Sequence, residues 1–343
     1  SPSGRGTAGI AGTLHAEGMD EGAYHVSTAA SLDEAFREVD AALLAVPAYA
    51  HAAVLPRIAA ALPPGLPLLI SPAASLAPVM LDVLVARRGA PSPRAPVGAK
   101  NPRAPVGAKN PRAPVGAMAT TPCGARRIAP DRVRVAMVRS AVEMAAVPAD
   151  GAAAMAKLAE ALFGMAFPLS PDALHVSFIN ANPITHSVLA LTNVTRIERA
   201  EAWPQYAMMT PFACNLMLAL AEERAAVAAA YGHALDGLDI FFNRANQVPI
   251  GPLHAMTAQI AAERPGVLGP DTTETRYVTE DIPFGLAYYM AVAAPKGIAM
   301  PVTDSMVRML EVLWGRDLRA NPLLAEIDLA QLPRLLAEGA GRG

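Results

Sequence analysis

Two domains are predicted from the sequence: an α/β domain built on a doubly wound parallel sheet, followed by an all-helical domain. Up to about residue 163, short apolar strands alternate with helical segments, which is typical of parallel sheets with crossover helices. Beyond residue 168 no strand pattern recurs, and the apolar residues follow a helical period. The chain of 343 residues, 53% of them apolar, is long enough to bury both cores.

The N-terminal residues contain a literal G-x-G-x-x-G, from Gly4 to Gly9. This pattern forms the pyrophosphate-binding turn of dinucleotide folds when it joins a strand to a helix. Only Ser1 to Ser3 precede it, and glycines interrupt the residues that follow, so we do not expect a phosphate loop here. A capping box at Ser31–Glu34 then predicts a short helix.

The regular alternation of strands and helices begins at residue 41. Ligands of doubly wound sheets bind at the carboxyl ends of the strands, and Val46, Pro47 and Ala48 occupy that position after the first strand. A plain strand-to-helix turn is the other interpretation of these three residues. Strands are expected over Ala41–Val46 and Leu66–Ile70, and helices over Tyr49–Leu62 and Leu76–Arg87.

The sequence P-R-A-P-V-G-A occurs three times within residues 93–117, with a period of nine residues. A repeat rich in Pro and Gly and without aromatic residues cannot form a packed unit, and three copies are too short for a solenoid. We therefore expect a Pro/Gly-rich insertion over residues 90–117. Its Arg and Lys side chains could contact phosphate, but without aromatic stacking groups a nucleic-acid partner is not expected.

The chain is expected to divide at residue 168 into a first domain (1–168) and a helical domain (169–343). The first domain should be completed by strands at Ala117–Thr121 and Val133–Val138 and by an Ala-rich helix at Pro148–Phe163. Helices of the second domain are expected at Pro183–Arg196, Thr210–Tyr231, Pro252–Glu263, Glu280–Ala293 and Thr303–Trp314.

Composition excludes several classes of protein. The net charge of −2 does not call for nucleic acid or an acidic membrane, and prolines interrupt the one uncharged stretch, residues 58–80, that is long enough to span a bilayer. Cys123 and Cys214 are too few for a disulfide framework, and no His or Cys spacing predicts a metal site. We expect a cytoplasmic protein with no membrane partner and no metal.

One stretch, Asn180–Asn193, carries the features of a substrate site. Asn182 followed by Pro183 predicts the start of a helix, and Asn182, His186 and Asn193 fall on one face of it. In the second turn the helix dipole favours the neutral imidazole of His186, which could then act as a base. The alternative is an ordinary core or surface histidine. Later in the chain, Glu280 and Asp281 stand beside Pro283 and predict a helix N-terminus.

The pattern N-x-N-P-x-x-H-x-x-L-x-L-x-N, followed about ninety residues later by R-Y-V-T-E-D-I-P-F-G-L and then by G-I-A-M-P-V-T-D, resembles the octopine/nopaline (opine) dehydrogenase family over nearly the whole chain. The resemblance implies a Rossmann-type domain followed by a helical domain, with NAD or NADP as cofactor. It also implies that the N-terminal glycine-rich part is missing, because Gly9–Gly12 resembles a segment well downstream of the phosphate loop.

The resemblance also assigns roles to residues. It implies that His186 and Asp304 form a catalytic pair and that Val46, Pro47 and Ala48 lie beside the nicotinamide ribose. Cys123–Arg126 resembles the family's Y-x-x-R, with Cys in place of the aromatic residue. Arg126 could therefore face an anionic cofactor or substrate, although a surface arginine is equally consistent. Asn182 or Asn193 could position a carboxylate.

The implied reaction is the reductive condensation of an amino acid with a 2-oxo acid, both small-molecule substrates, by an enzyme that could be a homodimer. A ketopantoate reductase-like or 2-hydroxy-acid dehydrogenase of the same architecture is an alternative. A non-enzymatic fragment or pseudoenzyme without the phosphate-binding turn is another.

Overall fold

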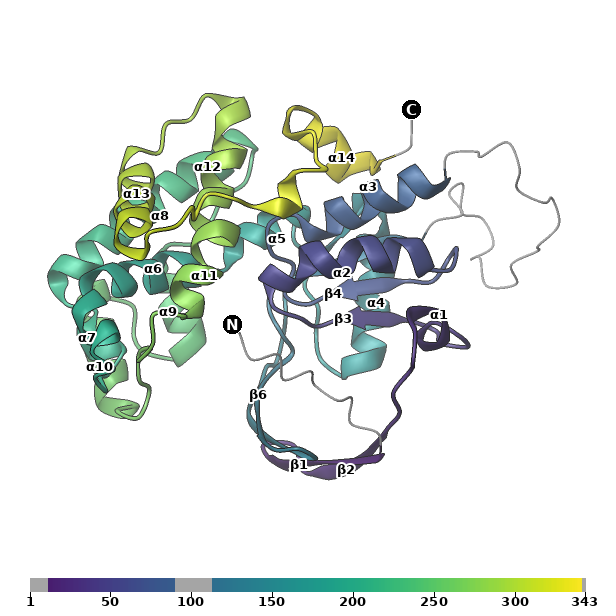
Figure 1. Cartoon of the computed structure of the whole chain (residues 1–343), viewed down its shortest axis with the longest axis horizontal. Helices are drawn as coiled ribbons and strands as arrows, with labels where there is room; N and C mark the ends of the chain where they lie inside the picture. The colour runs from purple at the N-terminus through teal and green to yellow at the C-terminus, as the bar shows by residue number, and fades with distance from the viewer. Residues whose placement is uncertain (1–11, 90–112, 341–343) are drawn as a thin grey trace.

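The computed structural model describes residues 12–89 and 113–340. Strands and helices alternate in the first domain, and the second domain is helical (Figure 1). This is the predicted fold class, and it is confirmed. The predicted G-x-G-x-x-G at Gly4–Gly9 lies outside the described residues.

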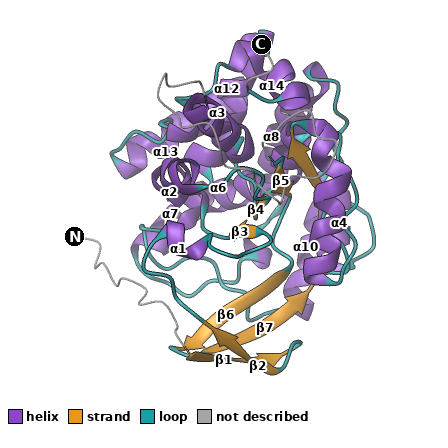
Figure 2. Cartoon of the chain, turned by 90° about the vertical axis from the view of Figure 1, so that its right-hand side faces the viewer, coloured by secondary structure: helices purple, strands orange, loops and turns teal. Residues whose placement is uncertain are grey.

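The main sheet has the strand order β3-β4-β5-β8. The first three strands are parallel, β8 is antiparallel to β5, and every residue of β4, β5 and β8 is buried, as expected for strands covered on both faces. Helices α2 (Ala48–Ala61) and α3 (Ala77–Gly89) cover one face, and α4 (Ala152–Phe163) covers the other (Figures 1 and 2). The strands are β3 (Ala42–Leu44), β4 (Leu68–Ile70), β5 (Val115–Met118) and β8 (Met144–Val147).

The predicted insertion over residues 90–117 is wrong at its C-terminal end. Val115, Gly116 and Ala117 belong to the third copy of the repeat, and they form the buried strand β5. Gly116 suits this place, because a Cβ there would lie 2.5 Å from Leu69 Cδ2 and 3.0 Å from Met155 Cε. The three copies have the same local sequence, so the sequence does not show which of them forms a strand. The pairing of the third copy with β4 and β8 decides this. The first two copies lie outside the described residues.

A second sheet, of order β2-β1-β7-β6, lies apart from the first (Figures 1 and 2). The predicted strand at Val133–Val138 is present as β7 but belongs to this sheet instead of the main one. Most residues of its strands are exposed or half-buried, so they lack the apolar runs that would have predicted β1, β2 and β6. The strands are β1 (Gly12–Gly18), β2 (Gly22–Val26), β6 (Cys123–Ala129) and β7 (Arg132–Val138).

The helical domain packs around α6 (Asn182–Thr192) and α8 (Pro211–Ala230), whose apolar residues join one continuous core. No helix in the described ranges is long and apolar enough to cross a membrane. Its other helices include α5 (Ala173–Ile179), α7 (Val194–Glu198), α9 (Leu238–Asn246), α10 (Leu253–Glu263), α11 (Arg276–Thr279), α12 (Ala287–Ala293) and α13 (Pro301–Trp314).

The C-terminal helix α14 (Leu332–Glu338) returns to the first domain, where it packs against β8 and lies beside α3 (Figure 1). Leu332, Leu335 and Leu336 are buried there. The division at residue 168 was therefore too simple for the last part of the chain, which completes the covering of the α/β domain.

Candidate active site

A cavity of about 390 Å³ lies between the two domains. On one side are the loops that follow β3, β4 and β5, at the carboxyl ends of three adjacent parallel strands. On the other side are the link between α5 and α6, the residues around α11, and the π-helical turn η3 (Ile282–Leu286). The polar side chains in its lining are Ser71, Thr120, Thr121, Ser177, Asn180, Asn182, Arg276, Glu280, Asp281 and Tyr289.

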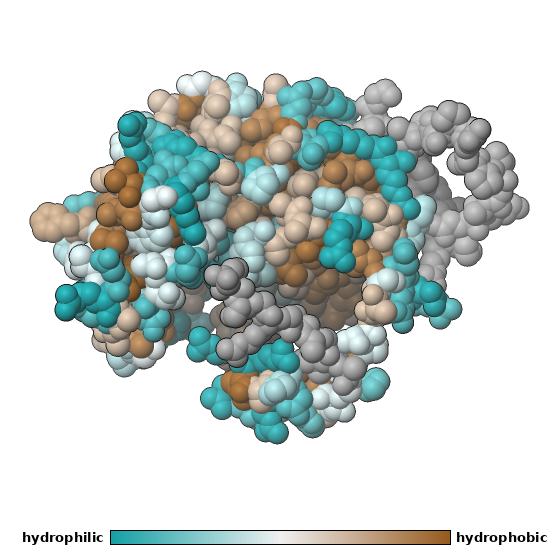
Figure 3. Space-filling view, viewed as in Figure 1, coloured by the Kyte–Doolittle hydropathy of each residue, from teal (hydrophilic) through white to brown (hydrophobic). Residues whose placement is uncertain are grey.

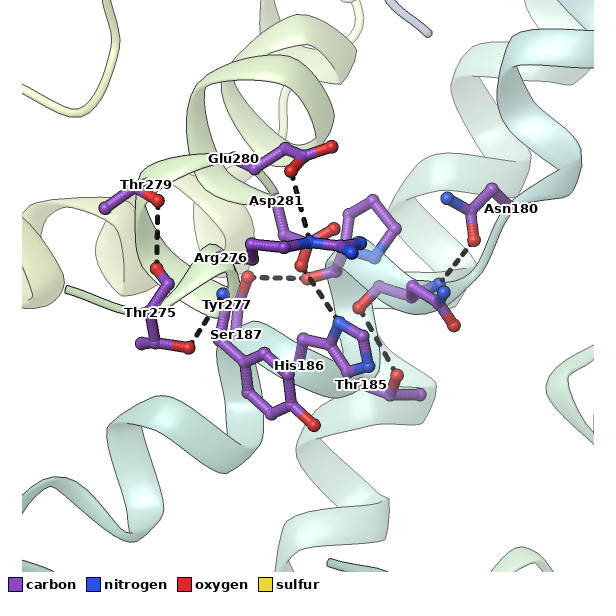
Figure 4. Close-up of polar contacts among 12 residues, drawn as sticks. Asn180, Thr185, His186, Ser187, Thr275, Arg276, Tyr277, Thr279, Glu280 and Asp281 are labelled. Atoms are coloured by element: carbon purple, nitrogen blue, oxygen red, sulfur yellow. Dashed lines mark hydrogen bonds and ion pairs between the residues drawn. The ribbon is translucent and has the colours of Figure 1, made fainter. Parts of the chain in front are cut away.

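His186 lies next to this wall, one helical turn beyond Asn182. Its Nδ1–H donates to Asp281 Oδ2 at 2.9 Å, and the two side chains are 14% and 8% exposed (Figure 4). The ring of Tyr277 stacks on the imidazole with centroids 3.9 Å apart, and its hydroxyl donates to Gln205 Oε1 at 2.7 Å. The ring of His186 is thereby held in one orientation, and its Nε2 makes no hydrogen bond to any described residue.

The predicted pair of His186 with Asp304 is wrong, because Asp281 is the carboxylate that His186 contacts. Asp304 is half exposed and accepts from Arg319 Nη1 at 2.7 Å. Packing decides between the two aspartates, since α11 and η3 lie on α6, whereas α13, which carries Asp304, packs on α8.

The close approach of η3 to α6 requires a glycine. A Cβ on Gly285 would lie 2.3 Å from Pro183 Cβ and 2.5 Å from Pro183 Cγ. Any side chain at this position would separate η3 from the start of α6, and with it Asp281 from His186.

The structure brings together some of the other predicted site residues. Val46, Pro47, Ala48 and Asn182 all line the cavity. Asn182 is not the helix cap that its sequence predicts, because α6 begins at Asn182 and Asn180 Oδ1 accepts from its backbone N–H at 3.0 Å.

Two predicted substrate-binding residues are absent from the cavity. Asn193 is buried, and its amide donates to Leu189 O and Thr192 Oγ1, at the end of its own helix. Arg126 lies exposed on β6, in the second sheet. The structure therefore supports neither as a substrate-binding residue of this cavity. Asn193 is hydrogen-bonded at the end of its own helix, and Arg126 lies in the second sheet.

Glu280 is a site residue whose role the sequence did not predict. It is 9% exposed, and its Oε1 accepts from the backbone N–H of Ala48 at 3.2 Å, while Arg276 Nε lies 3.2 Å from its Oε2. Burial raises the pKa of Glu280. Adjacent carboxylates beside a proline were the available signal in the sequence, but the partners of Glu280 and Asp281 lie 232 and 95 residues away.

The cavity fits the nicotinamide end of a dinucleotide. Three consecutive strand ends open on it, which is where doubly wound sheets bind such ligands. The loops there consist mainly of small residues, Ala45–Ala48 after β3 and Ser71–Ala74 after β4, so a flat ring could approach the backbone. Within residues 12–89 and 113–340, no three His, Cys, Asp or Glu side chains are grouped to hold a metal ion.

The helical domain has a match among known families. Residues 169–314 match the family model described as NAD/NADP octopine/nopaline dehydrogenase, alpha-helical domain. An opine dehydrogenase from Arthrobacter sp. (strain 1C) is 24% identical over 316 residues, which are 91% of this chain and 78% of that protein. The helical domain is therefore similar to that of the octopine/nopaline dehydrogenases. The similarity to the Arthrobacter opine dehydrogenase extends across both domains.

Solved structures of opine dehydrogenases have the same fold. An octopine dehydrogenase in complex with NADH and agmatine superposes with a TM-score of 0.68 at 15% identity, covering 94% of this chain and 83% of that one. A yersinopine dehydrogenase with bound NADP⁺ has a TM-score of 0.63 at 16% identity, covering 95% and 86%. The predicted resemblance to opine dehydrogenases and the predicted fold class are confirmed.

Proposed function

We propose that this chain is an NAD(P)-dependent opine dehydrogenase-like oxidoreductase that joins an amino acid to a 2-oxo acid by reductive condensation. The observation that carries the proposal is the His186–Asp281 pair beside a cavity at the strand ends of the α/β domain. The similarity to opine dehydrogenases supports the same reaction class.

His186 is proposed to move a proton at the reacting carbonyl. Asp281 accepts from Nδ1–H, so the neutral ring has its lone pair on Nε2, and a carboxylate beside Nδ1 stabilises the cation formed when Nε2 is protonated. When the amine adds to the 2-oxo acid, Nε2 can accept a proton that the amine nitrogen loses and then donate it to the former carbonyl oxygen, which leaves as water. The bound nicotinamide cofactor supplies the hydride that reduces the resulting imine.

The cavity lining offers groups for the substrates. The guanidinium of Arg276 is two-thirds exposed and can bind a carboxylate with two parallel hydrogen bonds. The amides of Asn180 and Asn182 lie at the same wall and can bind a second carboxylate. Val46, Pro47 and Ala48 on the opposite side are proposed to contact the nicotinamide ribose. We propose an amino acid and a 2-oxo acid as the small-molecule substrates.

Amine-dependent turnover is the test of this function. The chain is incubated with pyruvate and NADH or NADPH, with and without L-arginine and other L-amino acids, and consumption of the reduced cofactor is followed. Consumption that requires the amino acid, with the condensed product identified by mass spectrometry, supports the proposal. Consumption with 2-oxo acids alone would instead assign a ketopantoate reductase-like or 2-hydroxy-acid dehydrogenase activity. Absence of both turnover and nucleotide binding would assign the chain to the non-enzymatic alternative.

We also propose that two copies of the chain associate through the helical domain. Apolar side chains are exposed on α8 and α13, where Phe212 is 86% and Val312 77% exposed. These helices lie at the left of Figure 1, and Figure 3 shows apolar residues on that side of the molecule. Exposed apolar patches commonly mark association sites. The mass in solution, measured by light scattering, should be that of a dimer.

A cytoplasmic location is proposed because Cys123 and Cys214 are both free thiols, as is usual in a reducing compartment.

A further inference from the structure

Helix α2 begins without a cap from its own sequence. Its N-cap residue is Pro47, which provides no side-chain hydrogen bond, and no acidic residue stands in its first turn. The first backbone N–H groups of a helix have no partner inside the helix, and the helix dipole adds partial positive charge there. The start of α2 therefore needs an acceptor from elsewhere.

Glu280 of the helical domain supplies that acceptor. Its Oε1 accepts from the N–H of Ala48, the first residue of α2, in a buried contact between residues 232 positions apart. A second contact fixes the same loop from inside the first domain, since the buried ring of His51 hydrogen-bonds Val46 O at 3.1 Å. The loop from Val46 to Ala48 is thus held at both of its ends.

The position of Glu280 in the chain makes this contact relevant to catalysis. Glu280 directly precedes Asp281, the carboxylate bonded to His186, and the two residues form the turn between α11 and η3. One short segment therefore contacts the His186 ring through Asp281 and the loop after β3 through Glu280. The distance between the His186 ring and the loop 46–48 therefore depends on both the Asp281 and the Glu280 contact.

We propose that Glu280 is a positioning residue, which caps α2 from the other domain and thereby sets the place of the loop 46–48 relative to the His186–Asp281 pair. This inference rests on the proposed function for its catalytic meaning. Another contact joins the two domains nearby, because Ser75 Oγ, in the loop after β4, donates to Phe284 O at 2.5 Å. Loss of the cap should thus loosen the loop without separating the domains.

The test compares Glu280→Ala with Glu280→Gln and with Glu274→Ala as the control. Gln retains an oxygen that can accept from the Ala48 N–H, whereas Ala does not. Glu274 is an exposed glutamate earlier in the same segment, and its Oε1 lies 3.7 Å from Arg316 Nη1. Three quantities are measured: hydrogen exchange of the peptide that starts at residue 46, kcat and KM for pyruvate, L-arginine and the reduced nucleotide, and the melting temperature.

Glu280→Ala should speed exchange at the start of α2 and lower kcat roughly 10-fold to 100-fold, because small misplacements of reacting groups cost that much. KM for L-arginine and the melting temperature should change little, and Glu280→Gln should stay close to wild type in all three. Unchanged exchange in Glu280→Ala would overturn the cap, and unchanged kcat would overturn its catalytic role. Equal kcat losses in the Ala and Gln variants would also overturn it. The negative charge of Glu280, and not its hydrogen bond with the Ala48 N–H, would then be responsible for the effect.

The exchange measurement separates this inference from the proposed function. Hydrogen exchange can be measured without turnover. If the chain reduces no substrate but Glu280→Ala alone speeds exchange, the cap is supported and the proposed function is refuted. If the chain shows amine-dependent turnover but Glu280→Ala leaves exchange unchanged, the proposed function is supported and the cap is refuted.

Discussion

The neighbour of His186 decides which nitrogen of the ring is available for proton transfer. Asp281 accepts from Nδ1–H, Tyr277 covers one ring face, and Nε2 remains free of hydrogen bonds within the described residues. Asp304 has its own partner in Arg319 and is half exposed. The two aspartates are therefore expected to behave differently when each is replaced.

Three substitutions test this assignment. His186→Ala should lower turnover roughly 10²-fold to 10⁴-fold, as expected for a positioned acid–base group. Asp281→Asn should cause a smaller but clear loss, because an amide can donate to Nδ1 and favour the wrong tautomer. Asp304→Asn, the matched control, should leave turnover near wild type. Steady-state kinetics measures all three, and an Asp304→Asn loss as large as that of Asp281→Asn would contradict the pairing seen here.

His51 predicts how stability depends on pH. Burial lowers its pKa from 6.5 to about 4, so the folded protein keeps the ring neutral where the unfolded chain would protonate it. The free energy of unfolding should be unaffected by His51 above about pH 6.5 and should fall as the pH decreases toward 4, by about 3 kcal/mol in total. His51→Gln should remove this part of the pH dependence. Urea unfolding of both proteins at several pH values measures the difference, and parallel curves would refute the prediction.

At the scale of elements, small residues determine which segments can meet. Gly285 lets η3 lie against Pro183 at the start of α6, and Gly116 lets β5 lie beneath Leu69 of β4 and Met155 of α4. Both positions are ordinary glycines in the sequence. Their importance arises only from the atoms that occupy the space beside them.

The repeat provides a test with an internal control. Gly116→Val inserts three carbon atoms into a space already filled by Leu69 and Met155, so it should lower the free energy of unfolding by about 1–3 kcal/mol or more. Gly107 occupies the same place in the second copy, with the same neighbours P-V and A. Gly107→Val should have a smaller effect, because the third copy already occupies the place between β4 and β8. Thermal unfolding compares the two, and equal losses of stability would show that the second copy packs as well.

At the scale of the whole molecule, the two domains are joined at more than one place. The cavity lies between them, Glu280 contacts Ala48 across them, and α14 returns to cover the α/β domain. Residues 169–340 are thus not a helical unit separate from the sheet.

A core substitution in α14 should therefore destabilise the whole molecule. Leu332 is fully buried, so Leu332→Ala should cost about 2–5 kcal/mol of unfolding free energy through lost burial and the cavity that remains. Leu218, which is 41% exposed on α8, serves as the control for the same substitution. Unfolding is followed by circular dichroism, and similar effects of Leu332→Ala and Leu218→Ala would mean that α14 contributes nothing to the fold.

The sequence by itself determined the fold class and the helical nature of the second domain, which follow from apolar periodicity. The resemblance of its motifs to those of opine dehydrogenases indicated the candidate residues His186, Val46, Pro47, Ala48 and Asn182. Periodicity does not say which strand joins which sheet, so β7 in the second sheet and β5 in the third repeat copy were decided by tertiary structure.

Tertiary structure also decided the partner of His186. Asp281 and Asp304 both stand near the start of helical segments in family-like motifs, and local chemistry does not distinguish them. The contact of η3 with α6, permitted by Gly285, brings Asp281 to the ring, while α13 holds Asp304 beside Arg319. A hydrogen bond between residues 95 positions apart depends on how the helices pack, and packing is a property of the whole chain.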